Sequence, residues 1–203
     1  MPLKFIANSN ILAIGSSGTG KTTAVLRIIK EELISPMPSK IFYLYGAYQK
    51  EFDDWKKDTT NPLITFVEGL DLTVIDQYKG SKLLICDDLI LELNRKLTQH
   101  FISGSSHKNT TTIFISHSLY LNNELYRLIS NNSSYILLFK NKRNFSQVTR
   151  LGRQILGSRF ELLTSAYKYT KTFSFVLLSF HPLVPEELLV TSDFFEQCLS
   201  VFI

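Results

Sequence analysis

The residues of this chain best suited to chemistry form a glycine-rich segment near the N-terminus. The segment fits the pattern G-x-x-x-x-G-K-[ST], and its members are Gly15, Ser16, Ser17, Gly18, Thr19, Gly20, Lys21 and Thr22. An apolar run precedes it and a helical pattern follows it. At such a strand-to-helix turn, backbone N–H groups converge on one anion and the helix dipole favours negative charge. The segment therefore predicts a phosphate-binding loop (P-loop).

Side chains at the end of this loop have defined roles in the predicted site. The ammonium group of Lys21 would reach the β- and γ-phosphates, and the hydroxyl of Thr22 would ligate Mg²⁺. Thr23 follows in the first helical turn and completes the predicted nucleotide-binding segment. ATP and Mg²⁺ are the ligands that this pattern favours.

A second apolar run ends in two adjacent acids. Leu83–Cys86 is typical of a buried strand, and Asp87 and Asp88 follow it. Ligands of open α/β sheets bind at the carboxyl ends of the strands. Asp87 is predicted to hold Mg²⁺ together with Thr22, and Asp88 to orient and deprotonate an attacking water molecule. An acid after an apolar run is in isolation more often a turn residue, so the P-loop upstream is what favours this interpretation.

A third apolar run, Thr112–Ile115, is followed by Ser116 and His117. If this strand lies between the first two, its end faces the γ-phosphate. His117 is then the candidate sensor of that phosphate, with Ser116 as the second candidate. A histidine in this position also commonly caps a helix or binds a loop carbonyl, and that alternative stays open.

Basic residues gather between positions 140 and 159, and they are Lys140, Lys142, Arg143, Arg150, Arg153 and Arg159. Arginine suits two-pronged contact with phosphate. Arg143 and Arg153 are candidates for an arginine finger offered to the ATP of a neighbouring subunit, and the others could contact a DNA backbone. For any one of them, a solvated basic face is the simpler alternative.

Apolar runs alternate with helical patterns along the chain, which is typical of an α/β protein with a mostly parallel sheet. The predicted strands are Ile11–Ile14, Lys40–Tyr45, Ile64–Val67, Leu83–Cys86, Thr112–Ile115, Tyr135–Phe139 and Phe173–Phe180. The predicted helices are Lys21–Ile34, Lys50–Lys57, Leu89–Phe101, Leu119–Ile129, Gln147–Leu156 and Phe160–Tyr167.

Composition limits the class of protein. A length of 203 residues with 44% hydrophobic and 20% charged residues predicts one globular domain over 1–203, with an irregular tail from about 181 to 203. The net charge of +4 permits contact with nucleic acid without requiring it. Two cysteines, Cys86 and Cys198, predict neither a disulfide framework nor a zinc site and favour a reducing, intracellular compartment. No apolar run has the length of a membrane span.

Several segments together resemble the genome-packaging ATPases of poxvirus and polinton type, within the HerA–FtsK superfamily. The resemblance lies in the P-loop and in Lys82–Leu89, Gly104–Tyr120 and Tyr135–Leu156. Its most specific part is Ser133–Asn141, which is similar to the family's segment N-S-x-Y-h-h-x-F-K-N-P-R-D, where h is hydrophobic. Leu151–Gln154 is similar to the L-A-R-Q that follows it.

The resemblance implies a P-loop NTPase fold, a three-layer α/β/α sandwich with an extra strand between the P-loop strand and the Asp87 strand. It implies Lys21 and Thr22 on nucleotide and Mg²⁺, Asp87 on Mg²⁺ and Asp88 as the catalytic base. It also implies a homo-oligomeric ring, a pentamer or a hexamer, that drives double-stranded DNA into a preformed capsid, with a capsid or vertex protein as partner. Such a motor would work inside an infected or element-bearing host cell, with the virion as a further location.

The chain departs from the family pattern at three places. It has His117-Ser118 where the family usually has Gln-Asn, Lys142-Arg143-Asn144 where the family has Pro-Arg-Asp, and His107 alone where the family often has two histidines. A neutral imidazole donates from one nitrogen only, whereas a glutamine amide offers a donor and an acceptor. The altered sensor keeps open a nucleotide-binding switch or assembly factor with little turnover. A small-molecule kinase built on the same P-loop is a further alternative, although neither a lid nor an acceptor pocket is identifiable.

Overall fold

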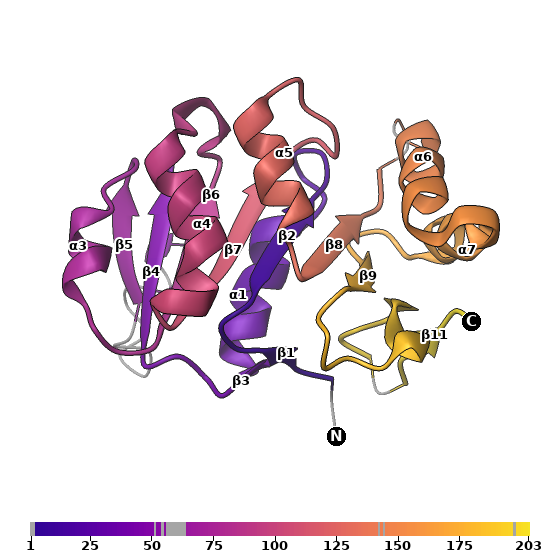
Figure 1. Cartoon of the computed structure of the whole chain (residues 1–203), viewed down its shortest axis with the longest axis horizontal. Coiled ribbons are helices and arrows are strands. Elements are labelled where there is room, and N and C mark those ends of the chain that lie inside the picture. Colours follow the sequence, from indigo (N-terminus) through magenta and orange to yellow (C-terminus); the bar gives the residue numbers. More distant parts are fainter. Residues whose placement is uncertain are drawn as a thin grey trace.

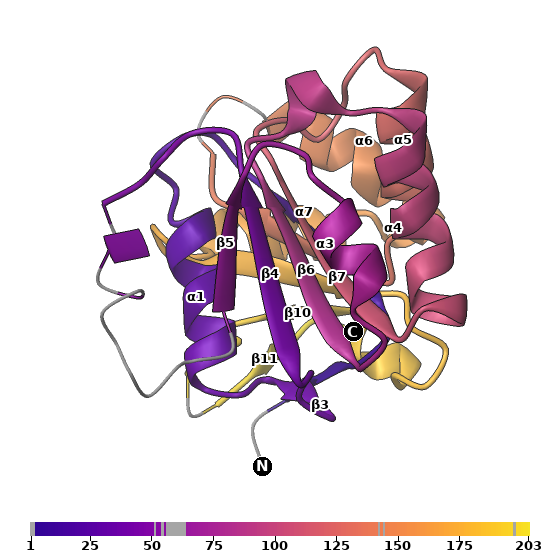
Figure 2. The ribbon, with the colours of Figure 1, turned by 90° about the vertical axis from the view of Figure 1, so that its left-hand side faces the viewer.

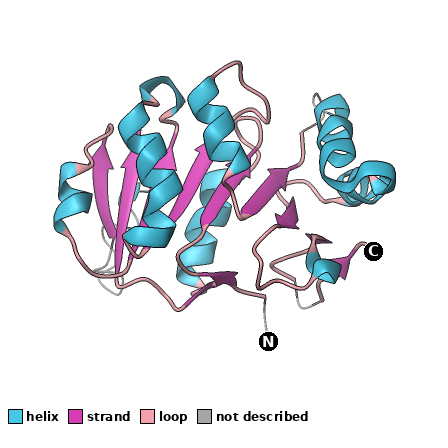
Figure 3. Cartoon of the chain, in the orientation of Figure 1, coloured by secondary structure: helices cyan, strands magenta, loops and turns pink. Residues whose placement is uncertain are grey.

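A computed structural model of the chain describes residues 3–50, 52, 53, 55, 64–141, 143, 145–196 and 198–203, with the backbone alone at 105–107. Within these residues, nine strands form one sheet with helices on both faces (Figures 1 and 3). The strands of the sheet are β2 (Asn10–Ile14), β4 (Lys40–Tyr45), β5 (Ile64–Glu68), β6 (Lys82–Asp87), β7 (Thr110–Ser116), β8 (Tyr135–Phe139), β9 (Phe175–Ser179), β10 (Val190–Ser192) and β11 (Ser200–Val201). Two further short strands, β1 (Phe5–Ile6) and β3 (Ile34–Ser35), pair with each other in parallel.

The helices connect and cover the strands. The α-helices are α1 (Lys21–Lys30), α3 (Thr73–Gln77), α4 (Arg95–His107), α5 (Glu124–Asn131), α6 (Phe145–Leu156) and α7 (Glu161–Tyr169). Short 3-10 helices occupy Ile90–Glu92, Gly157–Arg159 and Glu186–Leu188. Among the described residues, no helix has the length and apolar character needed to cross a lipid bilayer.

The sheet has the strand order β11-β10-β9-β8-β2-β7-β6-β4-β5. The six strands from β8 to β5 in this order run parallel, and β9, β10 and β11 add antiparallel to the edge beside β8. Strand β7 lies between β2 and β6, which confirms the predicted extra strand. Because β2, β7 and β6 are parallel, their carboxyl ends meet at one edge of the sheet.

Two hydrophobic layers hold the sandwich together. Alternate residues of β2 point to opposite faces, so Ile11 and Ala13 join the core beneath α1, while Leu12 and Ile14 join the core beneath the other helices. Figure 2 shows α1 on one side of the sheet and α3, α4, α5 and α6 on the other. A strand buried on both faces reads as a continuous apolar run, which is why β2 could be predicted from sequence. The α/β/α fold class is confirmed.

The first helix ends earlier than predicted. It stops at Lys30, and Ile34 belongs to β3. Glu32 has φ 51°, and the N–H groups of Glu32 and Leu33 donate to the carbonyls of Ile29 and Ile28. This paired arrangement is a Schellman motif, which usually carries glycine in the left-handed position. A glutamate in that position gave no sequence signal for the helix end.

Two other helices begin later than predicted, each after an asparagine. The Asn94 side chain accepts a hydrogen bond from the Leu97 N–H at 3.0 Å, and Asn123 accepts one from Tyr126 at 3.1 Å. These asparagines are N-caps, and they set the starts of α4 and α5. The predicted helices from Leu89 and Leu119 were therefore too long at their N-terminal ends.

The tail from 181 onward is more regular than predicted. Strand β10 pairs with β9, Val190 opposite Leu178, and β11 pairs with β10. Phe194 joins the core beneath α1. Strands of two or three residues carry little periodic signal, so β10 and β11 were not predicted from the sequence. Half of the predicted helix Lys50–Lys57 lies outside the described residues.

Candidate active site

The glycine-rich segment forms a tight turn between β2 and α1. A Cβ on Gly15 would lie 2.7 Å from both Phe139 Cβ and Thr19 Oγ1, so no larger residue fits there. Gly20, the residue before α1, has φ 89°, a left-handed conformation that favours glycine. The Thr19 hydroxyl donates to the Ser16 carbonyl at 2.8 Å and braces the turn. The local geometry is that of a phosphate-binding loop opening a helix.

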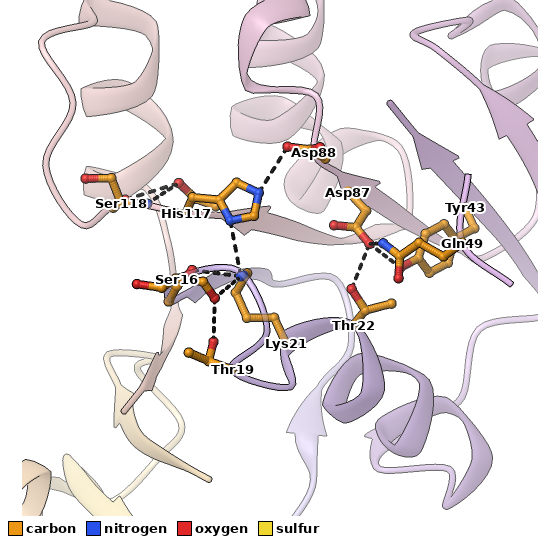
Figure 4. Close-up of polar contacts among 12 residues, drawn as sticks. Ser16, Thr19, Lys21, Thr22, Tyr43, Gln49, Asp87, Asp88, His117 and Ser118 are labelled. Carbon is orange, nitrogen blue, oxygen red and sulfur yellow. Dashed lines mark hydrogen bonds and ion pairs between the residues drawn. The ribbon is translucent and has the colours of Figure 1, made fainter. Parts of the chain in front are cut away.

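The predicted metal ligands lie in contact, as Figure 4 shows. The Thr22 hydroxyl, in the first turn of α1, donates to Oδ2 of Asp87 at 3.0 Å, although β7 separates β6 from the strand β2 that precedes the P-loop. Two residues that sequence reasoning missed reach the same oxygen: the Tyr43 hydroxyl donates to it at 2.7 Å and the Gln49 amide at 3.3 Å. A carboxylate that accepts three hydrogen bonds is fixed in orientation.

The residues at this point fit a magnesium ion. A threonine hydroxyl and an aspartate carboxylate are hard oxygen donors, and Mg²⁺ is usually bound by one or two protein ligands together with substrate phosphates. In the described part of the chain, no group of three or more histidine, cysteine or acidic side chains is placed to hold a metal ion by itself. The donor set therefore fits an ion that arrives with a nucleotide.

Burial dominates the electrostatics of Asp87, which is 4% exposed. Burial raises the pKa of its carboxyl, while the hydrogen bonds from Tyr43 and Thr22 and the charge of Lys21 lower it. Burial also raises the pKa of the Tyr43 hydroxyl, and the carboxylate of Asp87 raises it further. Tyr43 is consequently a permanent donor to this carboxylate.

Lys21 is held inside the loop. Its Nζ donates to the carbonyls of Gly15 at 2.7 Å and Ser16 at 2.9 Å, and lies 3.4 Å from Nδ1 of His117. Burial lowers the pKa of Lys21, and the nearby charges of Asp87 and Asp88 raise it. The two carboxylates thus favour a charged ammonium at the centre of the loop.

His117 connects the loop to the second acid. Its Nε2 lies 3.0 Å from Oδ1 of Asp88, so the ring bridges Asp88 and Lys21. The lysine ammonium can only donate, which makes Nδ1 the acceptor and places the proton on Nε2, where it is donated to Asp88. Asp88 has φ 57°, a conformation that aspartate tolerates better than most residues.

A cleft of about 830 Å³ opens over these groups. Its lining residues are Ser16, Ser17, Gly18, Gly20, Lys21, Thr22, Thr23, Ala47, Gln49, Asp87, Asp88, His117 and Phe173. The predicted sensor His117 lines this cleft. Ser116, the second candidate, is 1% exposed, and its hydroxyl donates to the Ser118 carbonyl at 3.1 Å. The geometry therefore favours His117 over Ser116 as the group that faces a bound phosphate.

The two candidate arginine fingers lie outside the cleft of their own chain. Arg143 and Arg153 have exposed side chains, and Arg153 packs over the Phe160 ring at 4.9 Å. The segment before α6 does touch the loop, because the Asn141 amide hydrogen-bonds the Ser16 hydroxyl. Lys142, Asn144 and the side chain of His107, which the sequence comparison singled out, lie outside the described residues.

Comparison with known proteins places the fold. No protein-family model and no curated protein sequence matches this chain. The DNA-packaging ATPase of Sulfolobus turreted icosahedral virus is similar over 97% of this chain and 98% of its own, with TM-score 0.58 and 11% identity. The genome-packaging NTPase of Sulfolobus turreted icosahedral virus 2, in complex with ATPγS, is similar over 97% of both chains, with TM-score 0.58 and 12% identity.

A cellular protein is similar as well. The KaiC-like protein of the archaeon Pyrococcus horikoshii OT3 matches 98% of this chain and 91% of its own, with TM-score 0.53 and 13% identity. At such low identities the likeness is one of fold. The chain has the P-loop NTPase fold in a form shared with viral packaging ATPases over nearly its whole length.

Proposed function

We propose that this chain, which shares its fold with viral genome-packaging ATPases, is an ATP-driven motor that moves double-stranded DNA into a capsid. One observation carries the proposal: Lys21 and Thr22, at the start of α1, meet Asp87 and Asp88, at the end of β6, in a single cleft. The strand β2 that leads into the P-loop is separated from β6 by β7. The nearly full-length match to packaging ATPases, one of them in complex with ATPγS, supports the choice of nucleotide and of process.

The cleft has the groups that ATP hydrolysis requires. Lys21 and the loop N–H groups would hold the phosphates, and Thr22 and Asp87 would hold Mg²⁺. Magnesium bound there would neutralise charge on the β- and γ-phosphates. Phosphoryl transfer depends mainly on the positioning of the reacting groups and on the stabilisation of charge. Fixed groups of the loop and of β6 would supply both.

Asp88 is the proposed general base. Its side chain is 42% exposed, so a water molecule can reach it, whereas the carboxylate of Asp87 is buried and engaged by three donors. The proton that Asp88 accepts would come from the attacking water. His117 donates to Asp88 and also touches Lys21, so a γ-phosphate that draws Lys21 toward itself would alter the hydrogen bonding of the base.

Coupling to DNA would involve neighbouring subunits. Arg143 and Arg153 are exposed and do not line the cleft of their own chain, which leaves them free to act on the next subunit of a ring. The net charge of +4 favours contact with DNA phosphates, which would be weakly dependent on sequence and strongly dependent on salt. A capsid or vertex protein would complete the motor inside an infected host cell.

The test is ATP hydrolysis with and without long double-stranded DNA, together with the mass of the protein in ATP and Mg²⁺. The proposal predicts that DNA increases turnover, that added salt removes the increase, and that the mass is that of a ring. Turnover unchanged by DNA at every salt concentration, from a protein that stays monomeric, would overturn the motor.

A nucleotide-binding switch is the second candidate, and the His117–Asp88 hydrogen bond favours it. A base already engaged by a neighbouring donor is less free to take a proton from water. A switch would bind ATP and hydrolyse it slowly, and Asp88→Asn would leave that slow rate unchanged. A motor would lose its turnover in the same variant.

A further inference from the structure

Phe173 is an aromatic side chain in an unusual place. It follows α7, its side chain is 68% exposed, and its backbone has φ 61°. Bulky residues rarely adopt this left-handed conformation, and the structure around them must compensate for the strain. Packing in the core does not account for the exposed side chain or the strained backbone of Phe173. Residues with such strained backbones cluster at ligand sites.

The position of Phe173 relates it to the P-loop. Its Cβ lies 3.6 Å from the point where a Cβ on Gly20 would be, so the ring stands next to the loop. Phe173 lines the large cleft and also a smaller crevice of about 170 Å³ beside it. The crevice residues are Gly20, Thr23, Ala24, Arg27, Phe173 and Phe195. Gly20 and Thr23 are also shared with the cleft, so the two spaces adjoin at the start of α1.

Phe195, from the C-terminal tail, lines the same crevice. The Arg27 guanidinium lies over its ring at 4.3 Å and donates to its carbonyl at 3.4 Å. The ring edge packs against Phe175, with centroids 5.5 Å apart. An ion pair of 3.6 Å between Lys171 and Glu196 connects the loop that carries Phe173 to the tail that carries Phe195. The tail thus has a fixed position beside the P-loop helix.

The two ends of the space formed by the cleft and the crevice differ in the residues that line them. Asp88 and His117 line the cleft and do not line the crevice, so the end of the cleft proposed to bind the γ-phosphate lies away from the crevice. A nucleotide whose γ-phosphate lies at Asp88 would extend its base toward the crevice. An aromatic face is the general partner of a nucleobase, because every base has a π-face.

We infer that the crevice holds the purine base of the bound nucleotide, with Phe173 as the stacking residue and Arg27 as the residue that positions Phe195. The inference rests on the proposed nucleotide-binding function and adds the base subsite to it. It also gives the C-terminal tail a role, because the tail supplies one of the crevice residues.

The test separates the base from the phosphates. Calorimetry would measure the affinity of the full chain for MgATP and for magnesium tripolyphosphate, which has the phosphates without a base. Phe173→Ala should weaken MgATP binding about tenfold and leave tripolyphosphate binding unchanged. Phe173→Gly should do the same while unfolding no earlier than wild type, because glycine tolerates φ 61° without strain.

The control is Tyr169→Ala, at an aromatic residue of similar exposure at the end of α7 that lines neither space. Its affinities should match those of wild type. MgATP binding unchanged in both Phe173 variants would overturn the inference, and so would an equal loss of both ligands, since Phe173 would then act through the loop. If wild type binds neither ligand, the proposed function itself fails, and Lys21→Ala, expected to lose both, distinguishes that case.

Discussion

Nε2 of His117 lies 3.0 Å from Oδ1 of Asp88, and the same ring touches Lys21 through Nδ1 at 3.4 Å. The imidazole thus joins the group proposed to take a proton from water to the group proposed to hold the γ-phosphate. Both side chains of the His117–Asp88 pair are more than 40% exposed, so the pair adds little to stability and its significance is chemical.

Asp88→Asn should bind ATP with nearly wild-type affinity and lose about 10²–10⁴-fold in turnover, because an amide cannot accept the proton of the attacking water. The measurements are nucleotide affinity by calorimetry and phosphate release at saturating MgATP. Asp88 is a half-exposed residue, so the variant should fold. Wild-type turnover in this variant would mean that another group is the base.

His117→Ala should lower turnover about tenfold, since the Asp88 carboxylate loses the hydrogen bond that orients it. His117→Gln should retain most of the activity, because a glutamine amide can donate to Asp88 and accept from Lys21 at once. Phosphate release by the two variants, measured side by side, checks this order. Equal losses in both would contradict a hydrogen-bonding role for position 117.

His100, on α4, gives a prediction of pH-dependent stability away from the site. It is 3% exposed; burial, with the charge of Lys108 second, lowers its pKa from 6.5 to about 4. The unfolded chain therefore binds a proton between pH 6.5 and 4 that the folded chain does not. Stability is fully present above pH 6.5 and falls as the pH drops through this window, by on the order of 3 kcal/mol.

His100→Leu should lose this contribution to the pH dependence. The difference in free energy of unfolding between variant and wild type, from urea titrations at pH 7 and pH 4, cancels the titrations that the two proteins share. It should shift in favour of the variant at pH 4. A difference that is the same at both pH values would show that His100 does not titrate as stated.

Arg143 and Arg153 should act on a neighbouring subunit. Arg143→Ala and Arg153→Ala would each be mixed with Asp88→Asn subunits, which keep their arginines but cannot hydrolyse ATP. A finger supplied in trans predicts that mixed rings recover part of the turnover that either variant lacks alone. If neither arginine variant is rescued by mixing, neither residue is such a finger.

The sequence was sufficient for the parts of the site that lie next to each other in the chain. The P-loop and the Asp87–Asp88 pair have local patterns, and their residue types are those that bind phosphate and Mg²⁺. The insertion of β7 between β2 and β6 followed from the family resemblance, and the structure confirms it. Parallel strands buried on both faces have continuous apolar sequences, so these strands of the sheet could be predicted from the sequence.

Contacts between distant segments could not be predicted. Tyr43 lies in the apolar run of β4 and looks like a core residue, yet its hydroxyl reaches Asp87 on the adjacent strand. Phe173 lies in a turn that follows a helix, and the sequence around it does not predict that this turn contacts Gly20. Such pairs depend on loop paths, which hydrophobic periodicity does not encode.

The proposed phosphate site is tested most directly by phosphate release from MgATP by wild type and by Lys21→Ala, with circular dichroism to compare their folds. Burial lowers the pKa of Lys21, so its replacement removes a charge that is costly to bury, and the variant should fold. We predict turnover by wild type and none above background by the variant. Equal turnover by the two folded proteins would contradict the assignment of this loop as the phosphate site.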